Sequence, residues 1–236
     1  MRQERVCSIC NWEGEKFLPC NPHFSHDESR KISGECKCPV CDSRSRHRAV
    51  MLLLKRLDLP VANQRILHVA PENFLVSYFG TKRPLQHEKI DKYVDQYPKN
   101  TVTEMDLVDV KFADHSFDFA FCAHVLEHIP DDNKAIRELY RILVPGGIAV
   151  LMVPIYPIEK TADLYDKGPD SMGHVHQPGS DYFKRYKAAG FAVNIYNLDK
   201  LYDPIQYGLR IGWDQIAVCH KPKNRITGLF RRLRYL

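Results

Sequence analysis

The sequence has no uninterrupted apolar run that approaches the roughly 20 residues a membrane-spanning helix requires, although 44% of its 236 residues are hydrophobic. Its first residues, 1–5, carry charged side chains and do not begin an apolar signal segment. From these two absences we expect that the chain has no signal peptide and no transmembrane segment, which favours a cytoplasmic location.

Glycine is scarce where many nucleotide-binding sheet proteins need it. The chain has 12 glycines, and none of them forms the G-x-G-x-x-G turn that lets a dinucleotide pyrophosphate approach a helix N-terminus. Its absence argues against a nicotinamide-dependent oxidoreductase, although the fold class predicted below would accommodate one.

Large apolar side chains are few in residues 1–43, too few for this segment to fold on hydrophobic burial alone. The segment holds six of the eight cysteines, whereas Cys122 and Cys219 lie in apolar runs that resemble strands. A cluster of this kind indicates metal binding and not the disulfide framework of a secreted protein.

Two C-x-x-C pairs lie 27 residues apart in that segment. Each tight turn presents both of its sulfurs on one side, so the two pairs predict four thiolates around a structural Zn²⁺. The predicted zinc ligands are Cys7, Cys10, Cys38 and Cys41. A redox C-x-x-C and incidental free thiols are the alternatives. Further candidate ligands, or bystanders, are Cys20, Cys36, His23 and His26.

From residue 65 onward, apolar strand patterns alternate with helical ones, which predicts an α/β fold with a doubly wound, mostly parallel sheet. The predicted strands include 66–70, 85–90, 117–122, 148–153, 191–196 and 215–219, and the predicted helices are 45–57, 131–143 and 180–189. The predicted domains are a zinc-ribbon-like module (1–43), a connecting helix (44–62), a Rossmann-like domain (63–220) and a basic tail (221–236).

The formal charge of +5 is local to the end of the chain. Residues 221–236 hold six basic residues and no acid, so subtracting six leaves −1 for the rest, which does not suit a basic nucleic-acid binder. Because the tail also carries apolar side chains, peripheral contact with an anionic membrane and disorder are both open.

Acids follow two of the predicted strands. Ligands of an open parallel sheet bind beyond the carboxyl ends of its strands. There, Asp91 after the second strand could accept both ribose hydroxyls, and Asp106 after the third could accept an adenine amino group. Either alone could be a turn residue or a helix cap, but together they predict a nucleoside site. The candidate contacts to this nucleoside cofactor are His68, Ala70, Glu72, Asp91, Asp106, Leu107, Ala123, His124 and Leu126.

Two segments carry a specific resemblance. Asp114 to Asp132, which contains Leu-Glu-His-Ile-Pro, and Glu138 to Gly147, which ends in Pro-Gly-Gly, closely resemble class I S-adenosylmethionine-dependent methyltransferases of the ubiquinone-biosynthesis-like, type 11 group. Residues 38–48 and 67–72 look like a bacterial subgroup that carries a zinc knuckle before this domain. The resemblance extends to His220 and implies a Rossmann-like sheet of seven strands with S-adenosylmethionine as cofactor.

The chain departs from that family after its first strand. Family members usually have an acid and two or three glycines there, whereas this sequence has His68, Ala70 and Glu72. A glycine-poor loop approaches the methionine portion of the cofactor less closely. Glu72 could compensate by pairing with the cofactor ammonium group, or Pro71 and Glu72 could simply cap the next helix.

Methyl transfer depends mainly on positioning and needs a general base only where the acceptor must lose a proton. His128 is a candidate base, although its segment could instead shape the cofactor loop. In loop 173–181, His174 and His176 could act as a base, bind a metal or contact the acceptor, or the loop could have no function. The sequence does not identify the methyl acceptor, with a small molecule or a sugar or lipid precursor slightly favoured over RNA, and it does not predict the oligomeric state.

A binding module is the rival interpretation. In it the zinc knuckle, the tail, and Arg44, Arg46 and Arg48 would hold nucleic acid beside a degenerate, inactive Rossmann domain.

Overall fold

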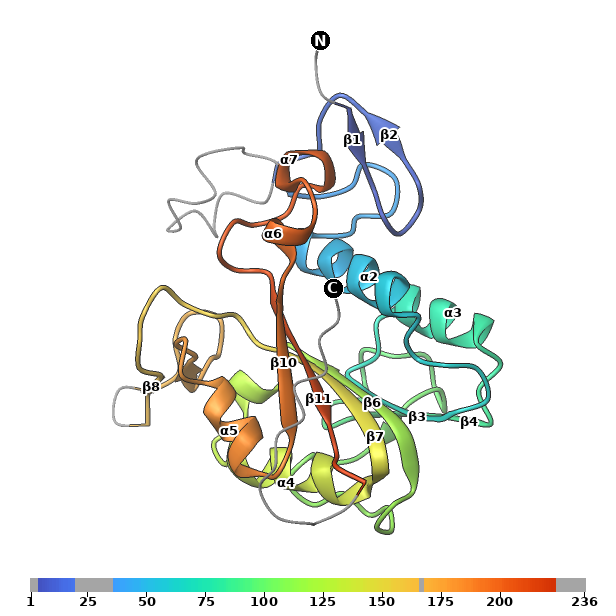
Figure 1. Ribbon diagram of the computed structural model, residues 1–236, viewed down its shortest axis with the longest axis vertical. Coiled ribbons are helices and arrows are strands. Elements are labelled where there is room, and N and C mark those ends of the chain that lie inside the picture. Colours follow the sequence, from blue (N-terminus) through green and yellow to red (C-terminus); the bar gives the residue numbers. More distant parts are fainter. Residues whose placement is uncertain (1–3, 20–35, 166–167, 224–236) are drawn as a thin grey trace.

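The computed structural model describes residues 4–19, 36–165 and 168–223. A seven-stranded sheet runs through its centre, helices cover both faces, and a small cysteine-rich module lies beyond one end (Figure 1). The strand order is β10-β11-β7-β6-β3-β4-β5, in which β11 runs antiparallel to both of its neighbours and the other pairs are parallel. The predicted Rossmann-like, mostly parallel sheet of seven strands is therefore confirmed.

The elements have the following bounds. The sheet strands are β3 (Arg65–Val69), β4 (Gln86–Asp91), β5 (Thr103–Glu104), β6 (Phe117–Ala123), β7 (Leu143–Met152), β10 (Ala192–Asn197) and β11 (Gln215–His220). The helices are α2 (Ser45–Leu57), α3 (Asn73–Thr81), α4 (Asp132–Ile142), α5 (Phe183–Ala188), α6 (Leu198–Leu201) and α7 (Pro204–Tyr207), with a 3-10 turn η2 (Leu126–His128). Two short pairs are β1 (Arg5–Val6) with β2 (Glu13–Gly14), and β8 (Ala162–Asp163) with β9 (His176–Gln177).

Strand β7 begins five residues earlier than the sequence indicated. Helix α4 ends at Ile142 and the strand starts at Leu143, which pairs with Phe117 of β6, so the Pro-Gly-Gly run lies inside β7. Gly146 N–H donates to the Lys221 carbonyl oxygen, and Lys221 N–H donates to that of Gly147. Gly146 has φ +89°, a conformation that favours glycine. The run is thus an irregular stretch near the start of the strand.

Alternate side chains of each central strand enter two separate cores, as a pleated sheet requires. Phe119 and Phe121 of β6 pack with α2 and α3 on one face, while Ala120 and Cys122 pack with α4 and α5 on the other. Helix α2, predicted as a connector, buries residues 49–54 against the sheet. It therefore contributes to the same core as the strands.

Arg48 joins the module to the rest of the chain. Its side chain is fully buried and donates to the carbonyl oxygens of Ser43 (2.6 Å), Tyr207 (2.7 Å) and Gly208 (2.9 Å). Its guanidinium also lies 3.9 Å above the Phe17 ring. One side chain of α2 thus contacts both the cysteine-rich module and the end of α7.

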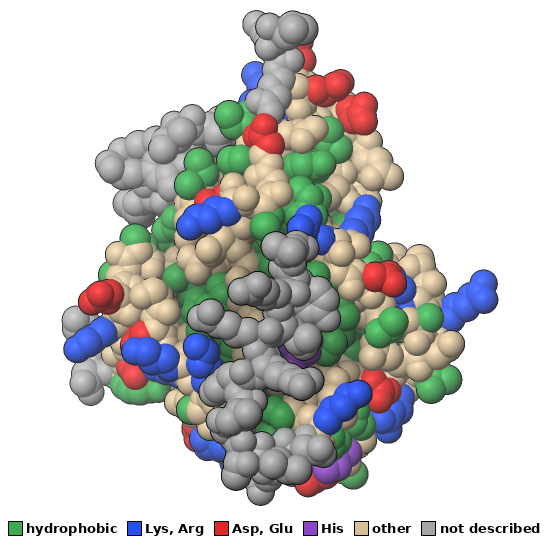
Figure 2. Space-filling model, in the orientation of Figure 1, with side chains coloured by type: hydrophobic (Ala, Val, Ile, Leu, Met, Phe, Trp, Pro, Cys, Tyr) green, Lys and Arg blue, Asp and Glu red, His purple; other side chains and the backbone are tan. Residues whose placement is uncertain are grey.

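Figure 2 shows acidic and basic groups interspersed on one face, and the β1–β2 region exposes Glu4, Glu13 and Glu15. The predicted arginine cluster is not a surface patch, because Arg48 is buried and Arg46 is partly buried. No helix among the described residues has the length and apolarity needed to cross a membrane. Residues 224–236 of the predicted tail lie outside the described residues.

Candidate functional site

The strand order reverses between β3 and β6, so the loops after these strands meet at the carboxyl edge of the sheet, where ligands of such folds bind. Two non-glycine residues there have left-handed backbones, Ala70 after β3 (φ +48°) and His124 after β6 (φ +55°). Each costs roughly 1–2 kcal/mol. Strained residues of this kind cluster at functional sites. Ala70 thus keeps the backbone conformation of a glycine at a family glycine position.

Glu72 follows Ala70 at the N-terminus of α3, yet its side chain makes no capping hydrogen bond. Its Oε2 lies 3.3 Å from Nε2 of His68, which is fully buried between the rings of Phe79 and Phe121. Burial lowers the pKa of His68, which favours the neutral ring as donor to the carboxylate. The contact between His68 and the Glu72 carboxylate therefore orients the Glu72 side chain in the loop after β3.

Asp91 and Asp106 occupy the ends of β4 and β5, as predicted. Asp91 accepts from the Tyr93 N–H through Oδ1 (3.0 Å) and from the Tyr97 hydroxyl through Oδ2 (2.6 Å). The two loops are joined because Nζ of Lys92 lies 2.9 Å from Asp106 Oδ2. Burial raises the pKa of Asp106, but the Lys92 and Val108 donors keep it below its ordinary value. Leu107 beside it is buried.

Arg46 on α2 adds a positive charge to the surroundings of this edge, and the sequence did not single it out for this role. No hydrogen bond or ion pair of its side chain is found among the residues that the structure describes. Burial lowers the pKa of its guanidinium, whereas the carboxylates of Glu72, Glu127 and Asp214 raise it. The partly buried guanidinium therefore interacts electrostatically with carboxylates of the candidate site.

Glu127 was also missed, although it lies between two predicted site residues. Its carboxylate is fully buried in η2, and neither oxygen has a hydrogen-bond partner in the described part of the chain. His124 Nδ1 lies 3.3 Å from Oε1 without hydrogen-bond geometry, and His128 Nε2 lies 4.0 Å from it. Burial raises the pKa of Glu127, but the neighbouring His124 and His128 bring it below its ordinary value. Ala123 and Leu126 are buried beside this group.

His128 and His174 lie on either side of that carboxylate, with ring centroids 4.8 Å apart. His128 Nδ1 is 3.0 Å from the Gly173 carbonyl oxygen, and His174 Nδ1 is 3.3 Å from Asp170 Oδ2 and 3.1 Å from the Tyr156 hydroxyl. Burial lowers the pKa of His174. The structure thus brings these two predicted catalytic residues together.

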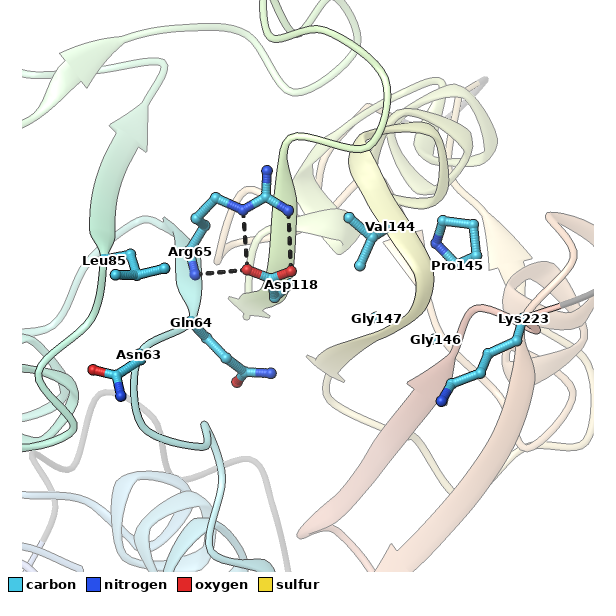
Figure 3. A pocket seen from close by; sticks show the side chains of 10 residues that line it. All are labelled: Asn63, Gln64, Arg65, Leu85, Asp118, Val144, Pro145, Gly146, Gly147 and Lys223. Carbon is cyan, nitrogen blue, oxygen red and sulfur yellow. Dashed lines mark hydrogen bonds and ion pairs between the residues drawn. The ribbon is translucent and has the colours of Figure 1, made fainter.

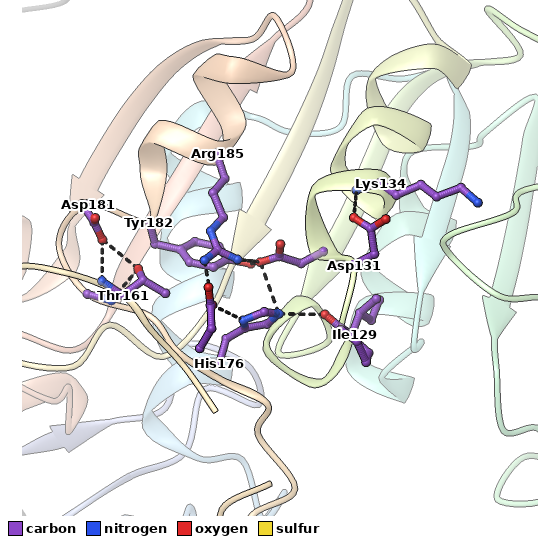
Figure 4. A network of polar contacts seen from close by, with 12 residues as sticks. Ile129, Asp131, Lys134, Thr161, His176, Asp181, Tyr182 and Arg185 are labelled. Carbon is purple, nitrogen blue, oxygen red and sulfur yellow. Dashed lines mark hydrogen bonds and ion pairs between the residues drawn. The ribbon is translucent and has the colours of Figure 1, made fainter. Parts of the chain in front are cut away.

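His176 lies elsewhere, in a network of polar contacts that links η2, α4, α5 and β8 (Figure 4). Its Nδ1 is 2.6 Å from Asp163 Oδ1 and its Nε2 is 2.9 Å from the Ile129 carbonyl oxygen. Arg185 bridges Asp163 (2.8 Å) to Asp132 (2.5 Å). Both ring nitrogens of His176 therefore contact groups that hold the scaffold together.

The four predicted zinc ligands converge. Cys7 Sγ is 3.6 Å from Cys41 Sγ, and Cys10 Sγ is 3.6 Å from Cys38 Sγ. Sulfurs at about 2.3 Å from a tetrahedral Zn²⁺ would be about 3.8 Å apart, so the spacing fits zinc closely. Burial raises the pKa of Cys7, but hydrogen bonds from the Cys10 backbone and from Ser43 bring it to about 7.

The other candidate zinc ligands are not part of this group. Cys36 is disulfide-bonded and lies outside the four-cysteine cluster. Cys20, His23 and His26 fall outside the described residues.

A cavity of about 500 Å³ lies at the opposite, amino-terminal edge of the sheet, lined by Arg65, Asp118 and the start of β7 (Figure 3). Arg65 and Asp118 satisfy each other there through paired contacts of 3.0 Å. Because ligands of this fold class bind beyond the carboxyl ends of the strands, the cavity does not define the candidate site despite its size.

Residues 83–151 match a family model described as a methyltransferase domain. A rice (Oryza sativa subsp. japonica) chloroplastic 2-methyl-6-phytyl-1,4-hydroquinone methyltransferase 1 is 34% identical over 126 residues, which cover 53% of this chain and 36% of that protein. The matches to this and two other curated relatives span from 18 to 36% of the relatives' lengths.

Solved structures share the fold at low sequence identity. An S-adenosylmethionine-dependent methyltransferase from Mesorhizobium loti has a TM-score of 0.55 at 15% identity, covering 73% of this chain and 97% of that one. A Haemonchus contortus phosphoethanolamine N-methyltransferase 2 in complex with S-adenosyl-L-methionine has a TM-score of 0.53 at 15% identity, covering 75% and 52%. Residues 83–151 therefore match a methyltransferase domain, and the sheet has the Rossmann-like fold of these solved structures.

Proposed function

We propose that this protein transfers a methyl group from S-adenosylmethionine to a small acceptor molecule. The observation that carries the proposal is that Glu72, Asp91 and Asp106 follow or end the neighbouring parallel strands β3, β4 and β5, at the carboxyl edge of the sheet. Asp91 and Asp106 lie inside the segment that matches a methyltransferase domain.

Each part of the cofactor has a chemically suited group at this edge. Asp91 would accept the ribose hydroxyls, since Oδ1 accepts a single hydrogen bond and a carboxylate oxygen can accept two. Asp106 would accept the adenine amino group beside the buried Leu107. Arg46 would pair with the methionine carboxylate and Glu72 with the ammonium group, because opposite charges form the stronger hydrogen bonds.

The bound cofactor supplies an electrophilic methyl group, whose bond to sulfur breaks with the electron pair left on a thioether as the acceptor bonds to carbon. The chain contributes positioning and exclusion of water. Ala123, His124 and Leu126 would line the methyl end of the site. His128 and His174 would face the acceptor, whereas His176 would support the scaffold.

The loops around Tyr156 favour a small acceptor. A cavity of about 340 Å³ is lined by 155–159 together with Ser180, Gly212 and Gln215, which is within the range for small-molecule sites. The rice relative is named for a hydroquinone and the Haemonchus enzyme for phosphoethanolamine, so small organic molecules are the first acceptors to test. The buried Arg48 makes nucleic acid a less favoured partner.

Calorimetric titration tests the cofactor. We expect S-adenosylmethionine to bind and a nicotinamide dinucleotide not to bind. Asp91→Asn should weaken binding about 10- to 100-fold, as expected for loss of a charge-assisted hydrogen bond. Asp95→Asn, at an exposed position of the same loop, should bind like the wild type. Absence of binding, or equal affinity of the Asp91 and wild-type proteins, would contradict the proposal.

We further infer that the four cysteines hold one structural Zn²⁺, supported by the sulfur spacing. All four positions of the tetrahedron would be filled by protein, which suits a structural role. Elemental analysis of the purified chain should give about one zinc per molecule. Cys38→Ser should lose it, whereas Cys122→Ala, at a buried thiol outside the module, should keep it. A chain without zinc would refute this inference.

A further inference from the structure

Side-chain atoms of Glu127, His128 and His174 that could bind a metal ion lie close to one another. A carboxylate oxygen of Glu127 and one ring nitrogen from each histidine all lie within 4.8 Å of one another. The Glu127 side chain is 0% exposed, and both of its oxygens lack a hydrogen-bond partner among the described residues. A buried carboxylate left in this state is costly unless a cation compensates it.

The neighbours of the two rings indicate which nitrogen holds the lone pair. His128 Nδ1 faces the Gly173 carbonyl oxygen, which can only accept, so Nδ1 carries the hydrogen. His174 Nδ1 lies 3.1 Å from the Tyr156 hydroxyl, which can donate or accept, and 3.3 Å from Asp170 Oδ2, and the carboxylate favours a hydrogen on Nδ1. With the hydrogen on Nδ1, each Nε2 is a lone-pair donor available to a metal ion.

A proton on His128 does not bridge to Glu127, because Nε2 of His128 is 4.0 Å from Oε1, too far for a hydrogen bond. His124 Nδ1 is nearer, at 3.3 Å from Oε1, but it makes no hydrogen bond with that oxygen and carries a positive charge only when protonated. A metal ion about 2.0–2.2 Å from each ligand atom can bridge a separation of about 4 Å. Among the described residues, no lysine or arginine side chain forms an ion pair with the Glu127 carboxylate.

We propose that Glu127, His128 and His174 bind one divalent transition-metal ion at the carboxyl edge of the sheet. Two imidazoles and one carboxylate form a donor set suited to zinc, iron, cobalt or nickel. Metal-binding histidines almost always donate their second N–H to a carboxylate or carbonyl oxygen. Here His128 Nδ1 has the Gly173 carbonyl oxygen at 3.0 Å, and His174 Nδ1 has the Asp170 carboxylate at 3.3 Å.

The backbone holds the ligands in place before a metal arrives. The Val175 N–H donates to the Glu127 carbonyl oxygen at 2.9 Å, which ties the loop of His174 to η2. The side chain of His128 is 40% exposed, whereas those of Glu127 and His174 are buried. The open positions of the metal would therefore face solvent on the side of His128.

The role of this site rests on the proposed methyl transfer. A metal at the mouth of the cofactor site would bind a hydroxyl or carboxylate oxygen of the acceptor and lower the pKa of a bound hydroxyl. The two histidines would then act as ligands and not as general bases. The acceptor class favoured by this arrangement is a small molecule with an oxygen that can coordinate the metal.

Cobalt titration tests the site directly. The full chain, with zinc in its cysteine module and with other metals removed by dialysis, is titrated with Co²⁺ and followed by visible spectroscopy and calorimetry. We expect one Co²⁺ per chain beyond the zinc, with a d–d spectrum that lacks thiolate charge-transfer bands. Glu127→Gln and His128→Gln should each weaken binding by about 100-fold or more, the upper range for loss of a supporting contact.

His115→Asn is the matched control, because His115 is exposed and distant in the chain and asparagine tolerates its φ of +60°. It should bind Co²⁺ like the wild type. The proposal is overturned by no Co²⁺ beyond the zinc, by thiolate bands, or by equal binding in both ligand variants.

Titration with S-adenosylmethionine in the absence of Co²⁺ separates the two proposals. Cobalt binding without cofactor binding refutes the methyl-transfer function alone, and the reverse result refutes the metal site alone.

Discussion

Two groups of carboxylates and histidines adjoin η2, and they differ in which cationic side chains pair with their carboxylates. The network of His176 contains Arg185, which contacts Asp132 and Asp163, and the Tyr182 hydroxyl, which donates to Asp132 at 2.6 Å. The Glu127 carboxylate has only histidine rings beside it, no lysine or arginine pairs with it, and neither of its oxygens has a hydrogen-bond partner among the described residues. The same residue types thus support the scaffold where donors meet acceptors, and indicate a ligand where acceptors meet acceptors.

The largest effect should come from breaking the ion-paired network of Asp132, Asp163 and Arg185. Asp132→Asn leaves the partly buried Arg185 without its closest carboxylate, and we expect the free energy of unfolding to fall by about 3–5 kcal/mol. Urea denaturation followed by circular dichroism measures this. Asp131→Asn is the control, because asparagine caps α4 as well as the aspartate that now accepts from Lys134 N–H. A loss below about 1 kcal/mol would show that the network does not stabilise the fold as argued.

The stability that depends on the neutral, partly buried His47 should be lost at a higher pH than the stability contributed by the ion-paired network of His176. Burial, and secondarily Arg46, lower the pKa of His47 to about 3. Between pH 6.5 and that value the unfolded chain binds a proton that the folded chain does not, so stability falls as the pH falls. In Asp163, burial raises the pKa, but Arg185 and His176 bring it below its ordinary value, so its contribution is lost only in stronger acid.

We therefore expect the free energy of unfolding of the wild type to fall by about 1–2 kcal/mol more than that of His47→Gln between pH 6.5 and 5. Denaturation at matched pH values measures the difference, in which effects of acid on the cysteine module cancel. Parallel pH profiles of the two proteins would be inconsistent with a neutral, buried His47.

A smaller effect should come from the strained turn at the cofactor edge. Ala70→Gly relieves a left-handed alanine but adds backbone freedom to the unfolded chain, so the net gain in stability should be about 0.5 kcal/mol. Ala188→Gly, at the exposed end of α5, should instead cost up to about 1 kcal/mol. Thermal denaturation distinguishes the two signs, and a loss at both positions would argue against strain at Ala70.

The smallest effect on stability is expected at Glu127. Glu127→Gln removes a buried charge that has only histidine rings and no lysine or arginine beside it, and that makes no hydrogen bond among the described residues. The metal-free protein should therefore change by less than about 0.5 kcal/mol or become more stable. The same urea assay measures this. A loss as large as that of Asp132→Asn would remove the distinction between the two groups.

The fold was predictable because its central elements have strong local patterns. The apolar run of β6 and the helical face of α4 gave bounds within about one residue of those observed. The early start of β7 was not predictable, because it depends on the pairing of Gly146 with Lys221, which is distant in the chain. Local sequence carries periodicity and turn chemistry but not long-range pairing.

The candidate site was predictable where a residue's place after a strand matters, as for Asp91 and Asp106. It was not predictable where burial and facing partners decide the role. Glu127 looks like an ordinary polar residue in a turn, and only the structure shows its carboxylate without a hydrogen-bond partner. Arg46 and Arg48 appear in the sequence as a basic cluster, yet the side chain of Arg48 makes its contacts inside the molecule.

The position of Arg48 makes the cysteine module and the sheet a single cooperative unit. Two of its carbonyl acceptors, at Ser43 and Cys36, belong to the module side, and two, at Tyr207 and Gly208, belong to the segment before β11. Deleting residues 1–43 would leave a buried guanidinium with half of its acceptors. Loss of the proposed zinc from the cysteine module should therefore also destabilise the sheet, and deleting the module should destabilise the remaining chain.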